Sequence, residues 1–119
     1  SPITYGDIRS SGNNESSREI RARVEQARKI QGERFAGENI RCNGEMSGRH
    51  IRKFCGLGRE EEKFMEEIFK KLALSARMHD RILKVARTTA DLAGEEKIRL
   101  ADLCEAVSYV KSRDKFWGN

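Results

Sequence analysis

Residues 74–92 read LSARMHDRILKVARTTADL, and the spacing of the apolar residues in this stretch decides the fold class. Ser75 is a preferred helix N-cap residue, and Gly94 is a preferred residue just beyond a helix C-terminus. The side chains between them that recur at helical spacing, and so share one face, are Met78, Ile82, Val85, Ala86, Thr89 and Ala93. The sequence therefore predicts a helix from Ser75 to about Ala93.

Four more segments carry helical signals. Ser16 and Glu19 have the spacing of a capping box at a helix start, and the run Gly56-Leu57-Gly58 separates two further helices. We expect the four helices over residues 17–35, 47–55, 59–72 and 99–111, with residues 37–44 as a loop. On the first, Ile20 belongs to the inner face. On the last, the predicted inward side chains are Leu100, Leu103, Cys104 and Val107.

The composition agrees with a helical domain. Hydrophobic residues make up 37% of the 119 residues and charged residues 36%, which is enough for one apolar stripe on each helix. Long β-sheets need more β-branched and aromatic residues than this. We therefore predict an all-α fold, a compact four- to five-helix bundle over residues 17–112. Residues 1–16 are predicted to form an extended arm, and residues 113–119 a C-terminal tail.

The three cysteines do not predict a metal site. Cys42, Cys55 and Cys104 are widely spaced and accompanied by only two histidines, whereas zinc sites have closely paired ligands. We expect reduced thiols, with Cys55 and Cys104 on apolar helix faces and Cys42 in a loop. No apolar run approaches the roughly 20 residues that cross a bilayer, and no secretory signal opens the chain. These features predict a cytoplasmic protein with no membrane partner.

The charge balance favours an anionic partner. A net charge of +5 and a pI of about 9.3 suit nucleic acid, nucleotide phosphate or an acidic protein surface. The 19 acidic residues are interspersed among the 24 basic ones, and no block of five or six like charges occurs. An ordinary solvated helical surface is therefore the alternative interpretation.

A row of basic residues follows one side of the helix predicted from Ser75. An arginine near a helix start can meet a phosphate, because its fork matches the phosphate oxygens and the helix adds N–H donors. The alternative is a solvent-facing row in which Asp80 pairs with Lys84 and Asp91 with Arg87. The row consists of Arg77, Arg81, Lys84 and Arg87, at spacings of four, three and three.

Independent catalysis is not expected of this chain. Nucleotide hydrolysis needs a glycine-rich loop that ends in Lys-Ser or Lys-Thr and cradles the phosphates. Gly56-Leu57-Gly58 is not followed by that pair, and the sequence has no Gly-x-Ser-x-Gly or His-Glu-x-x-His motif. The Glu60–Glu62 run indicates a helix start rather than an acid/base pair.

The stretch from Leu74 to Leu92 resembles the C-terminal domain of the magnesium-chelatase-like AAA+ ATPases, in the ComM/YifB branch. The family pattern there is Gly-Leu-Ser-Ala-Arg followed by Asp-Arg-Ile-Leu-Lys-Val-Ala-Arg-Thr-Ile-Ala-Asp-Leu. Here Leu-Ser-Ala-Arg ends at Arg77, and Asp-Arg-Ile-Leu-Lys-Val-Ala-Arg-Thr begins at Asp80. Residues 15–24, 46–55 and 98–109 resemble other family helices, so the resemblance covers nearly the whole chain. One departure is Ala73, which stands where the family has glycine.

The resemblance implies a lid subdomain of the AAA+ type from a longer protein whose core carries the phosphate loop. Arg77 matches the second-sensor arginine, which reaches the γ-phosphate of ATP, with Arg81 in a supporting role. ATP and magnesium are implied as cofactors of the parent protein, with neither bound by the fragment alone. The implied partners are the upstream AAA+ core, neighbouring subunits of a hexameric ring and DNA, on which competence members act as motors.

A second interpretation stays open, in which the chain is a stand-alone basic helical domain that binds DNA or another protein. The phosphate or DNA contacts would then come from Arg21, Arg28, Lys84 and Arg87. No helix-turn-helix spacing and no interleaved aromatic platform accompany these residues. Nothing in the sequence predicts metal chelation on a porphyrin.

Overall fold

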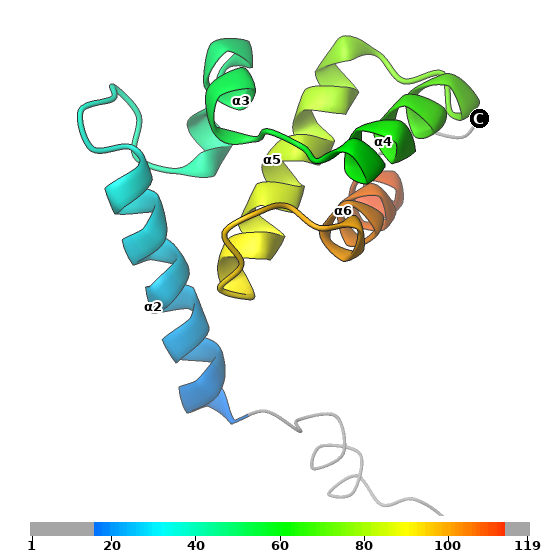
Figure 1. The fold of residues 1–119 in the computed structure, drawn as a ribbon. Coiled ribbons are helices and arrows are strands. Elements are labelled where there is room, and N and C mark those ends of the chain that lie inside the picture. The colour runs from blue at the N-terminus through cyan, green and yellow to red at the C-terminus, as the bar shows by residue number, and fades with distance from the viewer. Residues whose placement is uncertain (1–15, 114–119) are drawn as a thin grey trace, which may run out of the picture.

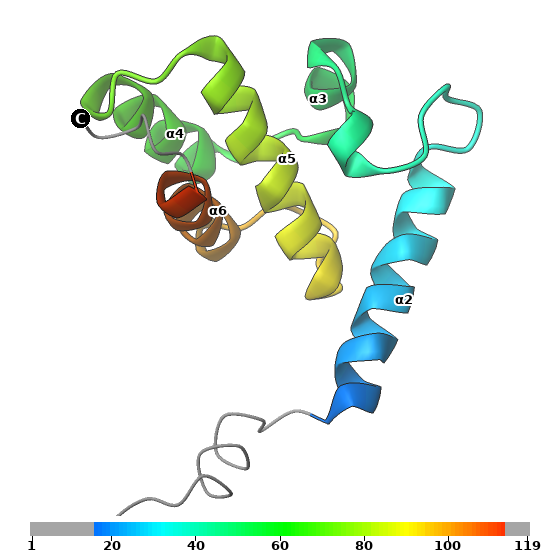
Figure 2. The ribbon, with the colours of Figure 1, turned by 180° about the vertical axis from the view of Figure 1, so that it is seen from behind.

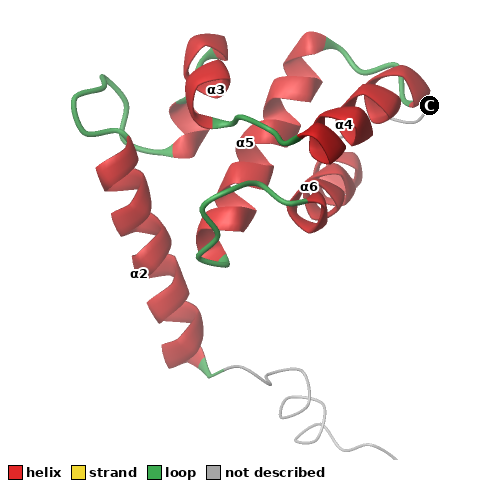
Figure 3. Cartoon of the chain, in the orientation of Figure 1, coloured by secondary structure: helices red, strands yellow, loops and turns green. Residues whose placement is uncertain are grey.

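The structure, a computed structural model, describes residues 16–113, and these residues form five α-helices and one 3-10 turn with no strand among them (Figures 1 and 3). The predicted all-α bundle is confirmed. The predicted arm and tail fall mainly on residues 1–15 and 114–119, outside the described residues. The elements are α2 (Ser17–Arg34), η1 (Asn43–Glu45), α3 (Gly48–Phe54), α4 (Arg59–Lys71), α5 (Ala76–Leu92) and α6 (Leu100–Arg113).

The helix termini follow the predicted local signals. Ser16 Oγ accepts a hydrogen bond from the backbone N–H of Glu19 at 3.1 Å, and Ser75 Oγ accepts one from Met78 N–H at 3.1 Å. Gly94 has a φ of +72°, so the chain leaves α5 through the left-handed conformation. Two bounds differ from the prediction, because α6 continues to residue 113 and part of the predicted loop forms η1.

α5 is the central helix of the bundle (Figures 1 and 2). It packs against α2, η1, α3 and α6, while α4 packs against α6. Ile82 of α5 and Leu103 of α6 are fully buried in the shared core. Full burial of an aliphatic side chain contributes about 1.5–3 kcal/mol. This core therefore fixes the position of α5 relative to α6.

The prediction for α6 was wrong at Cys104, which is exposed. The buried face of α6 runs instead through Leu103, Ala106 and Val110, and Cys104 falls on its outer side. Asp102 is also buried, because its carboxylate accepts a hydrogen bond from the backbone N–H of Arg99 at 2.8 Å. The buried face of α6 therefore includes Asp102 and excludes Cys104.

Cys55 is buried, as predicted, where the chain leaves α3. Burial raises the pKa of its thiol to about 11. Cys42 is exposed beside η1. Within residues 16–113, no helix is both long and apolar enough to cross a membrane.

α2 makes only a small apolar contact with the bundle. Ala27 is its one fully buried residue, and Ile20, predicted on the inner face, is 44% exposed. Phe35, directly after α2, is buried and meets the ring of Phe54 edge-on at a centroid distance of 5.2 Å. The N-terminal half of α2 extends away from the other helices (Figure 2). The helix is thus held near its C-terminal end.

Candidate functional site

A groove of about 860 Å³ lies where α5, α6 and η1 meet. α5 provides most of its lining, α6 contributes Glu105 and Tyr109, and η1 contributes Gly44. α5 also carries the buried residues Ile82 and Ala86. The same helix contributes to both the core and the groove. Core packing therefore fixes the backbone positions from which the groove side chains project.

Three cationic side chains line this groove, namely Arg77, Arg81 and Lys84. Arg77 and Arg81 are exposed and Lys84 is half-buried. Within the described part of the chain, none of the three makes an ion pair or a side-chain hydrogen bond. The expected pair of Asp80 with Lys84 is not formed, since the Asp80 carboxylate lies 3.4 Å from His79 Nδ1 instead. One carboxylate, Glu105, also lines the groove, so the three cations leave an excess of positive charge, which attracts polyanions.

The three cations are spaced for a chain of phosphates. Arg77 is the second residue of α5, at the end where the helix dipole is positive. At a rise of about 1.5 Å per residue, Arg81 lies about 6 Å and Lys84 about 10 Å further along the helix axis. A row of this length spans several linked phosphate groups. The predicted nucleotide-sensing residues Arg77 and Arg81, and the predicted phosphate contact Lys84, are therefore brought together.

Apart from the three cations and the Glu105 carboxylate, the groove lining is apolar or already hydrogen-bonded. Tyr109 is 49% exposed, and Val85 and Met78 also face the groove. Thr88 Oγ1 donates to the backbone carbonyl of Lys84 at 3.0 Å, so its hydroxyl proton is not available to a ligand. An aromatic and aliphatic strip beside a cationic row suits an organic phosphate.

The prediction that Arg87 contacts phosphate is corrected by the structure. The Arg87 side chain is 5% exposed, and its guanidinium donates to the backbone carbonyl oxygens of Glu95 and Glu96 at 2.8 and 2.9 Å. It also pairs with Asp91 at 3.1 Å, as predicted, but in the interior rather than in solvent. Burying an arginine is costly unless its donors are satisfied, and here the loop after α5 satisfies them.

The remaining predicted contacts lie elsewhere. Arg21 and Arg28 are exposed on α2 and do not line the groove. The structure therefore does not bring them together with Arg77, Arg81 and Lys84 in this groove.

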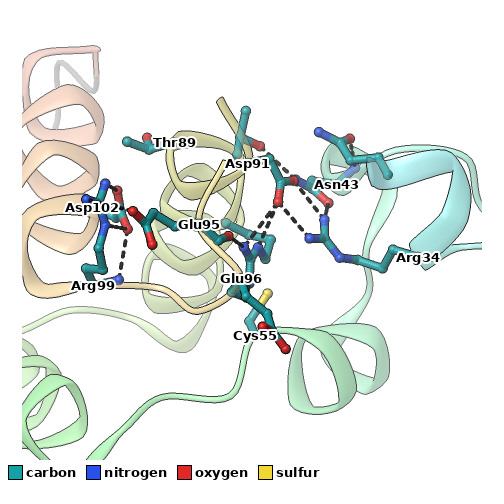
Figure 4. Close-up of polar contacts among 12 residues, drawn as sticks. Arg34, Asn43, Cys55, Thr89, Asp91, Glu95, Glu96, Arg99 and Asp102 are labelled. Carbon is teal, nitrogen blue, oxygen red and sulfur yellow. Dashed lines mark hydrogen bonds and ion pairs between the residues drawn. The ribbon is translucent and has the colours of Figure 1, made fainter. Parts of the chain in front are cut away.

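Sequence reasoning missed a buried polar cluster around Asp91, which is inaccessible to solvent (Figure 4). Arg34 of α2 donates to both of its carboxylate oxygens, at 2.6 and 2.8 Å. Asn43 Nδ2 donates to the same carboxylate at 2.8 Å. The pair of Asp91 with Arg87 could be predicted from its i, i+4 spacing. Arg34 and Asn43 lie far from Asp91 along the chain and belong to no motif, so the sequence did not indicate their contacts with it.

Metal ligation is not organised in the described residues. No group of three or more His, Cys, Asp or Glu side chains among residues 16–113 is arranged to hold an ion. The arginine and lysine side chains of the groove offer charge attraction and hydrogen-bond donation.

These features define a small helical-bundle domain with a cationic groove along its central helix. Residues 14–110 match the family model described as magnesium chelatase, subunit ChlI C-terminal. The chain belongs to this family, and the match includes every residue that lines the groove.

Three relatives agree with this assignment. The competence protein ComM of Haemophilus influenzae is 39% identical over 108 residues, which cover 90% of this chain and 20% of that protein. The proteins YifB of Salmonella typhimurium and Escherichia coli are 38% and 40% identical over 95 residues, 80% of this chain and 18% of each protein. The chain thus spans about a fifth of the length of the relatives it matches, in the branch that its sequence resembles.

Proposed function

We propose that this domain is the lid of an AAA+ ATPase and that Arg77 senses the nucleotide bound to the AAA+ core or to a neighbouring subunit. The observation that carries the proposal is the groove, in which Arg77 stands at the start of α5 with Arg81 behind it. Both guanidinium groups lack an acidic partner among residues 16–113. Membership of the magnesium chelatase family supports the location next to an AAA+ core.

The AAA+ core and this chain would have separate roles. The parent core would hold ATP and magnesium and supply the hydrolytic chemistry. This chain would bind and orient the terminal phosphates through the forks of Arg77 and Arg81, with Lys84 as a point charge. A hydrogen bond to a charged group contributes about 1.5–3 kcal/mol, so loss of one arginine weakens the response to nucleotide without unfolding the domain.

The test is ATP turnover by the parent protein with Arg77→Ala. We expect a loss on the order of 10-fold or more, which corresponds to about 1.4 kcal/mol of lost transition-state stabilisation. Arg52→Ala is the matched control, because Arg52 is exposed on α3 and does not line the groove. Turnover near wild type for Arg77→Ala would refute the sensor role, and an equal loss in both variants would indicate a non-specific effect.

In this proposal, the parent protein forms a ring of subunits and acts as a motor on DNA in competence or recombination. One Haemophilus relative is named a competence protein, which favours this setting. The alternative is direct binding of DNA by this domain, and the exposed Arg21 and Arg28 favour it because they are clear of the groove.

Binding of duplex DNA by the isolated chain, measured at several salt concentrations, distinguishes the lid proposal from direct DNA binding. Direct binding predicts an affinity that falls steeply with salt and weakens in Arg21→Ala/Arg28→Ala. The lid proposal predicts little binding and no effect of that double substitution on nucleotide-dependent turnover.

A further inference from the structure

Asn43 is the residue through which α2 and α5 meet. On the α2 side, its backbone N–H donates to Gln31 Oε1 at 3.0 Å, and its Oδ1 accepts from Arg34 at 3.0 Å. On the α5 side, its Nδ2 donates to Asp91 at 2.8 Å and to Thr88 Oγ1 at 3.1 Å. The side chain is 2% exposed, so every polar atom of this amide is committed to one of the two helices.

The same residue adjoins the groove. Gly44 follows Asn43 directly and lines the groove, and Thr88, its hydrogen-bond partner, lines it as well. No residue of α2 is part of the lining. Asn43 therefore connects a helix outside the groove to two points on its wall.

Arg34 makes this connection depend on the placement of α2. Its bidentate pair with the inaccessible Asp91 carboxylate is charge-assisted and largely buried, with 12% of the Arg34 side chain and 0% of the Asp91 side chain exposed (Figure 4). Removal of one partner of a buried pair is strongly destabilising, because it strands the other charge. α2 has little apolar burial of its own, so these polar bonds determine where it docks.

We propose that Arg34, Asn43 and Asp91 are positioning residues, which set the wall of the phosphate groove according to whether α2 is docked. This inference rests on the proposed function of the groove and adds its regulation. Coupling between two sites is reciprocal. If docked α2 shapes a groove that binds phosphates better, then phosphates bound in the groove hold α2 in its docked position.

The test is amide hydrogen exchange in the 119-residue chain, with and without millimolar tripolyphosphate, at constant ionic strength. We expect exchange in the C-terminal half of α2 to slow by about fivefold or more, the lower end of typical coupling between sites. In Asn43→Ala, tripolyphosphate should still bind through Arg77 and Arg81, but the slowing in α2 should be lost. A purely structural role would lower stability without removing a ligand-dependent response.

Two controls make the outcome decisive. Asp102→Asn perturbs another buried carboxylate that pairs with an arginine, at 2.9 Å, but does not line the groove, so its α2 response should resemble wild type. Arg77→Ala/Arg81→Ala/Lys84→Ala removes all three groove cations, so slowing that persists there would mean that tripolyphosphate acts from outside the groove and would overturn the inference.

The remaining outcomes separate the two proposals. Binding that depends on Arg77 without any change in α2 overturns the inference and leaves the sensor proposal standing. An unchanged α2 response in Asn43→Ala has the same meaning. No binding by the wild-type chain at millimolar tripolyphosphate overturns the inference, whereas the sensor proposal is decided by turnover of the parent protein with Arg77→Ala.

Discussion

Replacing Ala73 by glycine should stabilise the domain. Ala73 has a φ of +51°, the one positive φ at a non-glycine residue in the described part of the chain. The turn after α4 is a Schellman ending, in which Ala73 N–H bonds the carbonyl of Lys70 at 3.3 Å and Leu74 N–H bonds that of Phe69 at 3.0 Å. α5 ends with the same two bonds around Gly94, at 3.0 and 2.8 Å. The chain thus contains one motif twice, with alanine in one copy and glycine in the other.

The magnitude follows from two opposing terms. A side chain with a Cβ costs about 1–2 kcal/mol in the left-handed region, and the greater freedom of glycine in the unfolded chain costs about 0.4–1 kcal/mol. The net gain from Ala73→Gly is therefore about 0.8 kcal/mol, or a rise in Tm of about 3–6 °C. Ala73 is exposed, so no apolar burial is lost. Gly94→Ala should lose a similar amount, because its new Cβ would meet Gln26 at an ordinary 3.7 Å.

Urea unfolding of the 119-residue chain, followed by far-ultraviolet circular dichroism, measures both changes. Ala101→Gly is the control, since Ala101 is exposed within α6, where helical backbone makes glycine unfavourable by about 0.5–1 kcal/mol. The reasoning is refuted if Ala73→Gly is neutral or destabilising while Gly94→Ala destabilises. It is also refuted if Ala73→Gly and Ala101→Gly shift the midpoint in the same direction.

Three further outcomes are expected. Asp91→Ala strands two arginine charges, and urea unfolding should show a loss of about 3–5 kcal/mol; a loss below about 1 kcal/mol would contradict the buried pairs. Burial raises the pKa of Cys55 to about 11 from the usual 9.0, so the unfolded chain ionises first and stability should fall as the pH rises through that interval. Cys55→Ala should remove this part of the pH dependence. A thiol reagent at pH 8 should modify Cys42 and Cys104 quickly and Cys55 only on unfolding; equal rates would be inconsistent with the burial.

The helices were predictable because their signals are local. Ser75 and Gly94 bracket α5 in the sequence, and the capping hydrogen bond and the positive φ are both found in the structure. The apolar periodicity of α5 likewise predicts its core residues, such as Ile82 and Ala86. Such features depend on residues within one or two helical turns of each other. They can therefore be predicted from one sequence without knowledge of tertiary contacts.

The errors arose where tertiary contacts outweigh local pattern. Cys104 was predicted on the buried face of α6, but it is exposed. The buried face includes Asp102 instead, whose carboxylate accepts a hydrogen bond from the backbone N–H of Arg99. Arg87 was predicted on a solvent-facing line, but backbone carbonyls of the following loop and the Asp91 carboxylate draw it into the core. Asn43 gave no signal at all, because its four partners belong to two helices that are distant in sequence.

The groove itself was predictable only in part. The spacing of Arg77, Arg81 and Lys84 places them on one line, and the structure gives that line a groove. The contributions of Tyr109 and Gly44 depend on how α6 and η1 pack against α5. No local pattern encodes that packing.

The outward extension of α2 has a consequence for how the chain meets a protease. Trypsin needs a locally opened backbone, and the first turns of α2 can open without disturbing the core. Arg18 and Arg21 lie in those turns and are exposed, whereas Arg87 is enclosed and becomes a cleavage site only after global unfolding. Brief digestion should therefore cut at Arg18 or Arg21 before it cuts at Arg87. The same turns can accept substitutions freely, because no other part of the bundle rests on them.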